Sequence, residues 1–438
     1  MRGPAAVILA GALLACGATS NGGFGDGTGN DGGTTGPGGE GGTFGGDDSG
    51  SFGGQGGPTF GTTCNGTATS VTGTVYAPNG TDPLPNIYVY AAAKVNPFPA
   101  GNFCNQCNSP LDNWYSHTQS GNDGTFSLSL SNVPAGADIQ LVINVGRFRK
   151  VTPLPVKCGS NAAPKAATTL PGKAADGDIP KIAVSTGNSD HLDQILGVLG
   201  ITEYDCYEGR ASTGSSSPTC QPVDSLSNLL LKKSATPIDA YHLLFVSCAP
   251  NAFKNYATSG VNTATLSSNV SSFVTSGGRL FATDMSYDYV AQAFPSAITW
   301  QGPTGAPQPV DGANVGAAGS YNGNVDDPSL KAWMTGLGVP TSPVPLQGFL
   351  NPWSVQASLP KTSTLIVDGT VSYTGAGGAT SGDVPLTSQF DVSACGRVVY
   401  SSYHTAGGTV TPGNLLPQER ILEYLVFEVG SCVTPTPQ

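Results

Sequence analysis

The sequence has few charged residues, and basic residues are the scarcer kind. Only 11% of its 438 residues are charged, where an ordinary soluble protein has about 25%. With 18 Lys and Arg against 29 Asp and Glu, the net charge is −11, and no basic residue lies between Arg2 and Lys94. This balance excludes a nucleic-acid-binding protein that neutralises phosphates, and a protein that binds membrane surfaces through a basic cluster.

Cysteine is too sparse for a scaffold held together by disulfides alone, with ten residues in the whole chain. Together with the low charge and the abundance of small polar residues, these cysteines indicate an exported protein in an oxidising compartment. The sequence contains no motif that names a substrate. We expect no cofactor and no metal ion.

The N-terminus has the pattern of a targeting signal. An apolar run over residues 5–15 is too short to span a bilayer. It ends with Ala15 before Cys16, and residues 1–16 therefore resemble a bacterial lipoprotein signal peptide. The resemblance implies that Cys16 is lipidated and anchors the protein in a membrane, and Gly17 fits sorting to the outer membrane. The alternative is an ordinary secreted protein in which Cys16 is unmodified or removed.

Glycine dominates the next segment, residues 17–62. Between Gly22 and Gly57, 19 of the 36 residues are glycine. Such a segment cannot bury enough apolar surface to offset the entropy of ordering, so we expect a flexible tether between the membrane and the folded part.

Residues 63–160 alternate apolar and polar side chains in short runs separated by turn sequences, which predicts an antiparallel β-sandwich. The expected strands are Ser70–Tyr76, Ile87–Ala93, Thr125–Leu130 and Ile139–Val145. The turn sequences PNG at 78–80, NDG at 122–124 and PAG at 134–136 arrive in an order that resembles the carboxypeptidase regulatory-like, prealbumin-type domain. This resemblance implies a non-catalytic accessory module that acts as a spacer or as a weak sugar or protein binder.

A linker over 161–179 precedes residues 180–432, in which strands and helices alternate; residues 433–438 form a tail. The alternation predicts an α/β domain with an open, mostly parallel sheet covered on both faces. Residues 286–372 form a long excursion from this sheet. The expected elements are Lys181–Thr186, Tyr241–Ser247, Arg279–Thr283 and Arg397–Tyr403 as strands, with His191–Leu199, Leu226–Lys233, Thr265–Ser276 and Glu419–Glu428 as helices.

The α/β region resembles the class I glutamine-amidotransferase-like superfamily, nearest its ThuA-like branches. The features that carry the resemblance are a strand ending at Cys248, the run TSGGRLF at 275–281 and the run GRVVYSSYH at 396–404. Amidotransferase members place a nucleophilic cysteine at a strand-to-helix elbow and a histidine after a late strand. Here His404 matches the histidine, but the expected elbow carries Asp284, which implies that amidotransferase activity is absent.

Without Cys16, nine cysteines remain, and one of them has no partner within the chain. The pairs that their positions favour leave Cys248 free, although nine cysteines permit many pairings. These pairs are Cys64–Cys158, Cys104–Cys107, Cys206–Cys220 and Cys395–Cys432.

Cys248 follows a buried strand at the edge of the sheet where α/β proteins place ligands. With His404 as base and Asp284 to orient it, Cys248 could form a Cys/His/Asp site. The alternatives are a thiol buried in the core, which is common for free cysteine, and an intermolecular disulfide.

Weaker candidates are aromatic and acidic. Trp300, Trp353 and Tyr321 of the excursion, which also contains Trp333, could stack on a sugar or peptide, or could simply pack the excursion onto the sheet. A divalent ion could bind to four acids, although helix capping is the commoner role. These acids are Asp284, Asp288, Asp326 and Asp327.

The remaining histidines indicate structural roles. His191 lies in a run, Asp190 to Asp193, that is typical of a helix start, and His117 and His242 stand alone. The sequence therefore predicts a surface-exposed or periplasm-facing outer-membrane lipoprotein of the cell envelope, with a non-catalytic binding or structural role and a glycan or protein as partner. The alternative is an extracytoplasmic hydrolase of a glycan or peptide that uses Cys248, His404 and Asp284.

Overall fold

The fold is that of a computed structural model, which describes residues 58–107, 112–188, 190–210, 219–405, 410–411 and 413–433. The predicted signal peptide with Cys16, and nearly all of the Gly-rich segment, lie outside these residues. Among the described residues, no helix is long and apolar enough to cross a membrane.

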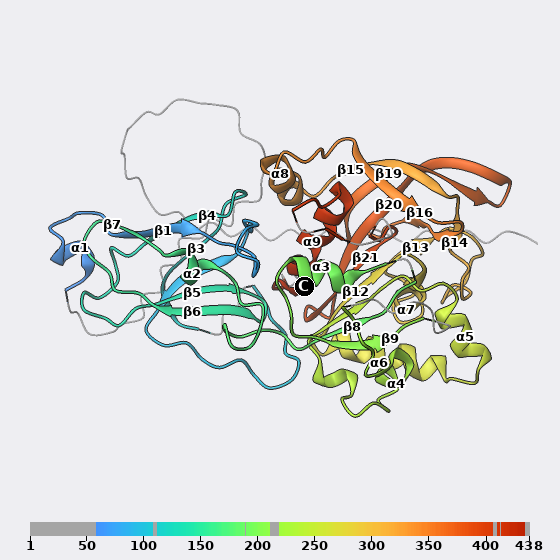
Figure 1. Cartoon of the computed structure of the whole chain (residues 1–438), viewed down its shortest axis with the longest axis horizontal. Coiled ribbons are helices and arrows are strands. Elements are labelled where there is room, and N and C mark those ends of the chain that lie inside the picture. The colour runs from blue at the N-terminus through green and yellow to red at the C-terminus, as the bar shows by residue number, and fades with distance from the viewer. Residues whose placement is uncertain are drawn as a thin grey trace, which may run out of the picture. The chain divides into compact units, whose positions relative to one another are not determined.

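Two sheets form the predicted β-sandwich (Figure 1). The four expected strands are confirmed, and three that the sequence analysis missed, β3, β6 and β7, complete the sheets. One sheet has the order β4-β1-β7 and the other the order β3-β2-β5-β6, with every pair antiparallel except β1 with β7. The strands are β1 (Ser70–Thr74), β2 (Tyr88–Ala92), β3 (Trp114–Gln119), β4 (Thr125–Ser129), β5 (Gln140–Val145), β6 (Phe148–Pro153) and β7 (Ser160–Ala162), and a short helix, α1 (Phe60–Thr63), precedes them.

Residues 161–179, expected as a linker, are instead packed into the sandwich. Strand β7 pairs with β1, and it is followed by a short helix, α2 (Lys165–Thr168). Thr169 bridges Tyr76, and Asp178 bridges Arg149 of β6. Because these hydrogen bonds hold the segment along its length, it does not act as a free hinge.

The larger sheet is parallel in one half and antiparallel in the other. Its parallel half has the order β10-β9-β8-β11-β12-β21, and β20 and β19 extend it as an antiparallel hairpin. The prediction of a mostly parallel sheet therefore holds for the first half only. The parallel strands are β8 (Ile182–Ser185), β9 (Asp205–Glu208), β10 (Asp224–Ser225), β11 (Leu243–Val246), β12 (Arg279–Thr283) and β21 (Gly396–Ser401).

The antiparallel half is built largely from the predicted excursion. The hairpin of β19 and β20 is the longest pair of strands, and β15 joins it to β16. The strands of this half are β14 (Asn314–Gly316), β15 (Gly319–Val325), β16 (Val344–Phe349), β17 (Trp353–Ser354), β19 (Ser363–Gly375) and β20 (Gly378–Val392), while β13 (Thr299–Trp300) and β18 (Gln356–Ser358) pair in a separate two-stranded sheet.

Helices cover both faces of the parallel half, as the continuous apolar strands predict. Alternate side chains of each strand enter different cores: Phe245 and Phe281 belong to one, and Leu244 and Leu280 to the other. Helices α3 and α9 lie on the first face, and α4, α5 and α6 on the second (Figure 1). The helices of this region are α3 (Leu192–Val198), α4 (Leu226–Leu230), α5 (Ala252–Thr258), α6 (Thr263–Thr275), α7 (Asp288–Ala291), α8 (Pro328–Gly336) and α9 (Pro417–Gly430).

One hydrophobic core joins the sandwich to the α/β region. The apolar side chains inside the sandwich and those on the α9 side of the large sheet form a single cluster. Phe148 of β6 packs edge-on against Phe427 of α9, with ring centroids 5.5 Å apart. The indole of Trp333 in α8 donates a hydrogen bond of 2.7 Å to the carbonyl of Pro83. The two parts therefore form one continuous packed body.

Two disulfides also link these parts, and they correct the predicted pairing. Cys64–Cys158 and Cys206–Cys220 form as predicted. The predicted pairs Cys104–Cys107 and Cys395–Cys432 are wrong, since the structure links Cys104 to Cys395 and Cys107 to Cys432. The four disulfides fit an extracytoplasmic protein.

The reason for the exchange is the path of the segment that carries Cys104 and Cys107. Gln106 pairs in parallel with Val433, so the segment is extended there. Residues three apart in an extended chain lie about 10 Å apart, beyond the roughly 7 Å that a disulfide can bridge. Close approach also requires a glycine: a Cβ on Gly277, at φ +105°, would lie 2.3 Å from the carbonyl oxygen of Phe103.

Candidate functional site

Loops that follow four parallel strands bring polar side chains to one edge of the sheet. Asp190 follows β8, Cys248 follows β11, Asp284 follows β12 and His404 follows β21. Strand order reverses between β8 and β11, because β9 lies on the other side of β8. Open α/β sheets bind ligands at the carboxyl ends of strands beside such a reversal.

The three side chains predicted to form a Cys/His/Asp site do come together there, and we call Cys248, Asp284 and His404 the strand-end cluster. The Sγ atom of Cys248 lies 3.4 Å from Oδ2 of Asp284. Nε2 of His404 lies 3.5 Å from the same oxygen. All three ligand atoms lie within 4.8 Å of one another. Spacing along the strands therefore identified residues that are far apart in sequence and adjacent in space.

The strand-end cluster is buried, with Cys248 0%, Asp284 1% and His404 3% exposed. Burial raises the pKa of the Cys248 thiol well above its usual range, and the negative charges of Asp284 and Asp190 act in the same direction. Burial also raises the pKa of Asp284 to about 6, although His404 opposes this shift. The thiol is therefore protonated at neutral pH, and a protonated thiol is a poor nucleophile.

Asp284 occupies a turn of the kind that presents nucleophiles in hydrolases. It follows β12 directly with φ +42°, at the start of the short 3-10 helix η2 (Asp284–Ser286). A sharp turn from strand to helix is the geometry of a nucleophile elbow. Here the carboxylate points into the protein: Oδ1 accepts a hydrogen bond of 2.9 Å from the amide of Ser354, in the excursion.

Asp190 organises the cluster, a role that its place in a helix-start pattern did not predict. Its Oδ2 accepts hydrogen bonds from the amide of Cys248, at 3.2 Å, and from the hydroxyl of Thr283. Its Oδ1 accepts from the amide and the hydroxyl of Thr405, at 3.2 and 3.1 Å. Asp190 therefore ties together the loops after β8, β11, β12 and β21. Its position shortly after a buried strand was the signal that could have revealed this.

The burial of Trp300 and Trp353 contradicts the predicted stacking of a ligand on them, whereas for the part-buried Tyr321 it stays a prediction. Trp353 is fully buried, and its indole donates to the carbonyl of Ala317. Trp300 packs edge-on against Tyr400, and Tyr321 packs edge-on against Phe349. Trp353 and Tyr321 pack within the excursion, and Trp300 packs the excursion onto β21 of the sheet, which was the alternative interpretation.

The four acids considered for a divalent ion do not converge. Asp327 caps α8, where its Oδ1 accepts from the amide of Leu330 at 2.7 Å. Asp288 is buried and accepts instead from the amide of Asp311 at 3.1 Å. Within the described residues, the only group of three or more possible ligands that lies close enough to hold a metal ion is the strand-end cluster.

The other histidines have structural contacts, as expected. Nδ1 of His242 accepts a hydrogen bond of 2.8 Å from the amide of Lys181. His117 packs on Trp114 with ring centroids 4.4 Å apart. His191 precedes α3, and its amide donates to the hydroxyl of Thr405 at 3.0 Å.

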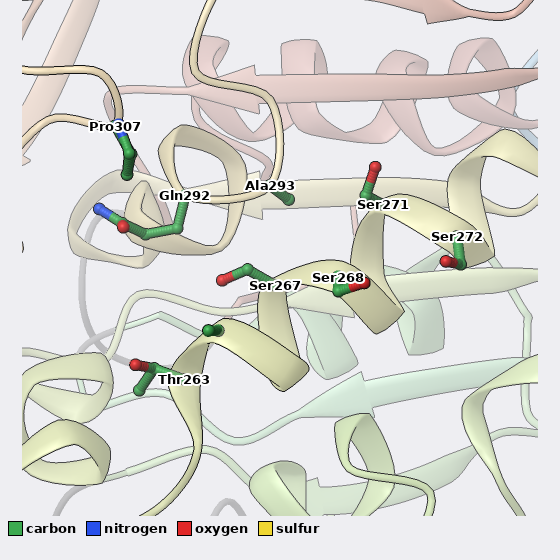
Figure 2. Close-up of a pocket in the computed structure, with 9 residues that line it drawn as sticks. Thr263, Ser267, Ser268, Ser271, Ser272, Gln292, Ala293 and Pro307 are labelled. Atoms are coloured by element: carbon green, nitrogen blue, oxygen red, sulfur yellow. The ribbon is translucent and has the colours of Figure 1, made fainter.

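A separate groove of about 500 Å³ runs along α6. Figure 2 shows the row of hydroxyl-bearing side chains that α6 contributes, with Gln292 and Pro307 on neighbouring segments. Ser267 has a buried hydroxyl without a hydrogen-bond partner in the described part of the chain. Among the described residues, no aromatic or charged side chain lines this groove. It offers hydrogen bonds to a polar ligand, but no stacking surface. Its residues from α6 are Thr263, Ala264, Ser267, Ser268, Ser271 and Ser272.

Comparison with known proteins adds no family. No family model matches the chain, and no curated protein matches it. Among solved structures, a 9R-lipoxygenase from Cyanothece PCC8801 is 11% identical over 22% of this chain and 17% of its own length, with a TM-score of 0.14. A likeness this low carries no argument about fold or function.

Proposed function

We propose that the protein is a lipoprotein tethered to the outer membrane, and that it acts in the cell envelope as a non-catalytic binding or structural protein. The observation that carries the non-catalytic role is the burial of the strand-end cluster, whereas the tether rests on the signal-peptide pattern that ends at Cys16. A cysteine hydrolase must present a thiolate to its substrate, whereas Cys248 is fully buried and its pKa is raised well above the usual range.

The construction of the folded part supports the same proposal. A continuous core and two disulfides hold the sandwich against the α/β region. Such a packed and covalently linked body suits a protein that displays a surface. The hydroxyl-lined groove along α6 is a candidate site for a glycan or protein ligand, because it supplies several hydrogen-bonding groups in a row.

The reactivity of Cys248 tests the non-catalytic role. We expect iodoacetamide to leave Cys248 unmodified in the native, full-length protein across pH 6 to 9, and to label it rapidly after non-reducing unfolding in guanidinium. Mass spectrometry of the Cys248 peptide measures both rates. Fast native labelling that follows a thiolate titration near neutral pH would overturn the proposal.

A variant at Cys16 tests the tether. We expect Cys16→Ser to move the protein from the membrane fraction to the soluble fraction, because acyl chains supply the affinity for the bilayer. Cys248→Ser is the matched control, and it should remain in the membrane fraction. Equal membrane association of both variants would rule out the lipid anchor.

The second candidate is a hydrolase, and a specific observation favours it: the three predicted side chains do meet at the carboxyl ends of the strands. For this function, the excursion would have to move away from the cluster, since Ser354 hydrogen-bonds Asp284 directly. Hydrolysis of a glycan or peptide that His404→Ala abolishes would establish this function and remove the first.

A further inference from the structure

The strand-end cluster has the spacing of metal ligands as well as the composition of a catalytic group. Zinc binds sulfur at about 2.3 Å and nitrogen or oxygen at about 2.0 to 2.2 Å, so ligand atoms at tetrahedral angles lie about 3.4 to 3.6 Å apart. The thiol and imidazole lie 3.4 and 3.5 Å from Oδ2 of Asp284. Two of the three separations therefore match without any rearrangement, and the third lies within 4.8 Å.

An unpartnered nitrogen points to a ligand at the same place. His404 is buried, and its Nε2 has no hydrogen-bond partner among the described residues. Its Nδ1 lies in hydrogen-bonding contact with the carbonyl oxygen of Thr405, which can only accept, so Nδ1 carries a proton. In the neutral ring, Nε2 then carries a lone pair that faces Oδ2 of Asp284, which is also a hydrogen-bond acceptor. Oδ2 already accepts from the thiol of Cys248, so a cation between the two atoms supplies the partner that Nε2 lacks.

Neighbouring groups hold each of the three residues in place by hydrogen bonds, as they do for metal ligands in proteins. Ligating histidines usually donate their other ring N–H to a carbonyl or carboxylate, and ligating carboxylates are themselves hydrogen-bonded. The carbonyl of Thr405 holds the ring of His404, and the amide of Ser354 holds the free oxygen of Asp284. Asp190 holds the backbone at Cys248.

Charge decides the kind of ion. A thiolate, a carboxylate and a neutral imidazole carry a total charge of −2, and a divalent cation cancels the charge of these three ligands. Sulfur and nitrogen ligands exclude Ca²⁺ and Mg²⁺, which prefer oxygen, whereas zinc accepts all three ligand types.

We propose that Cys248, Asp284 and His404 bind one divalent transition-metal ion, with Zn²⁺ as the best fit. Binding displaces the proton of the Cys248 thiol to solvent, and leaves one tetrahedral position for a water molecule or another small ligand. This inference replaces the expectation from sequence that the chain binds no metal. In a buried site the ion joins the loops after β11, β12 and β21, a stabilising role that the proposed non-catalytic function does not require.

The test measures metal content in the full-length protein. We expect about one equivalent of zinc by elemental analysis of wild-type protein purified without chelators, and loss of that zinc in His404→Ala and in Cys248→Ser. His242→Ala is the matched control, since His242 is part-buried in the same body and lies outside the cluster; it should retain the metal. Wild-type protein that is folded and metal-free, and stays so after refolding with zinc, would overturn the inference.

A second readout separates ligation from misfolding. Wild-type protein unfolded without reductant in the presence of chelator, then refolded with Co²⁺, should show the absorption of cobalt bound to a thiolate, and Cys248→Ser should lack it. Refolded protein without this absorption contradicts the inference. If the thiol is also unreactive in the native state, the non-catalytic function stands while the metal site falls; a reactive, metal-free thiol removes both.

Discussion

Removal of the two disulfides that join the sandwich to the α/β region should lower the free energy of unfolding by about 4 to 8 kcal/mol, at the usual 2 to 4 kcal/mol for each bridge. The variant replaces Cys104, Cys107, Cys395 and Cys432 with serine, so that no new thiol remains. The expected loss is large because each bridge closes a long loop in the unfolded chain, with the linked cysteines 291 and 325 residues apart in sequence. Urea unfolding under non-reducing conditions, followed by tryptophan fluorescence, measures the loss.

The stabilisation that each bridge contributes depends on whether the other bridge is present. When the Cys107–Cys432 bridge is present, Cys104 lies only 3 residues from Cys107 and Cys395 lies 37 residues from Cys432, so the Cys104–Cys395 bridge closes a short loop. Either pair alone therefore retains most of the constraint, and single-pair variants should lose less than half of the combined effect. The Cys206→Ser, Cys220→Ser variant is the comparison for a local bridge, because its loop spans 14 residues. A four-serine variant as stable as the wild type would refute the linkage.

Arg149→Met should destabilise the protein by about 3 to 5 kcal/mol, because it leaves a buried carboxylate without its cation. The guanidinium of Arg149 lies 3.4 Å from Oδ2 of Asp112 and 2.8 Å from Oδ2 of Asp178. Arg149 and Asp112 are both 4% exposed. The same guanidinium lies 4.0 Å from the ring centroid of Phe98. Denaturant unfolding of the variant measures the change.

The matched variants separate charge from packing. Asp112→Asn in the Arg149→Met background removes the unpaired charge and should recover much of the lost stability. Arg147→Met, two residues away, should cost less, because Arg147 is only part-buried and donates its hydrogen bonds to carbonyls at exposed positions. If Arg149→Met unfolds at the same urea concentration as the wild type, the ion pairs do not stabilise the sandwich.

Much of the α/β region could be predicted from the sequence, because its strands are continuous apolar runs between helical patterns. The ends of those strands then placed Cys248, Asp284 and His404 at one edge without any knowledge of contacts. The prediction succeeded because the carboxyl ends of parallel strands lie at the same edge of a sheet, so that residues directly after such strands lie close together in space. Strand β9 was missed because it is short, with Cys206 and Tyr207 as its only buried residues.

The disulfide exchange and the shared core could not be predicted in this way. A Cys-x-x-Cys spacing favours a local bridge only if the segment turns, and the pairing of Gln106 with Val433 depends on contacts across nearly the whole chain. The roles of Trp300 and Trp353 could not be predicted for a similar reason, since an aromatic ring in a glycine-rich excursion can face either a ligand or the core. Burial decides between the two, and burial is a property of the assembled fold.

A disulfide map of the intact protein tests most directly whether the sandwich and the α/β region are covalently joined and whether Cys248 is buried. Native protein is treated with light iodoacetamide, unfolded without reductant, treated with heavy iodoacetamide and digested. The structure predicts linked peptides for Cys104–Cys395 and Cys107–Cys432. It also predicts that Cys248 carries the heavy label and no light label. A Cys104–Cys107 bridge within one peptide, or a light label on Cys248, would contradict it.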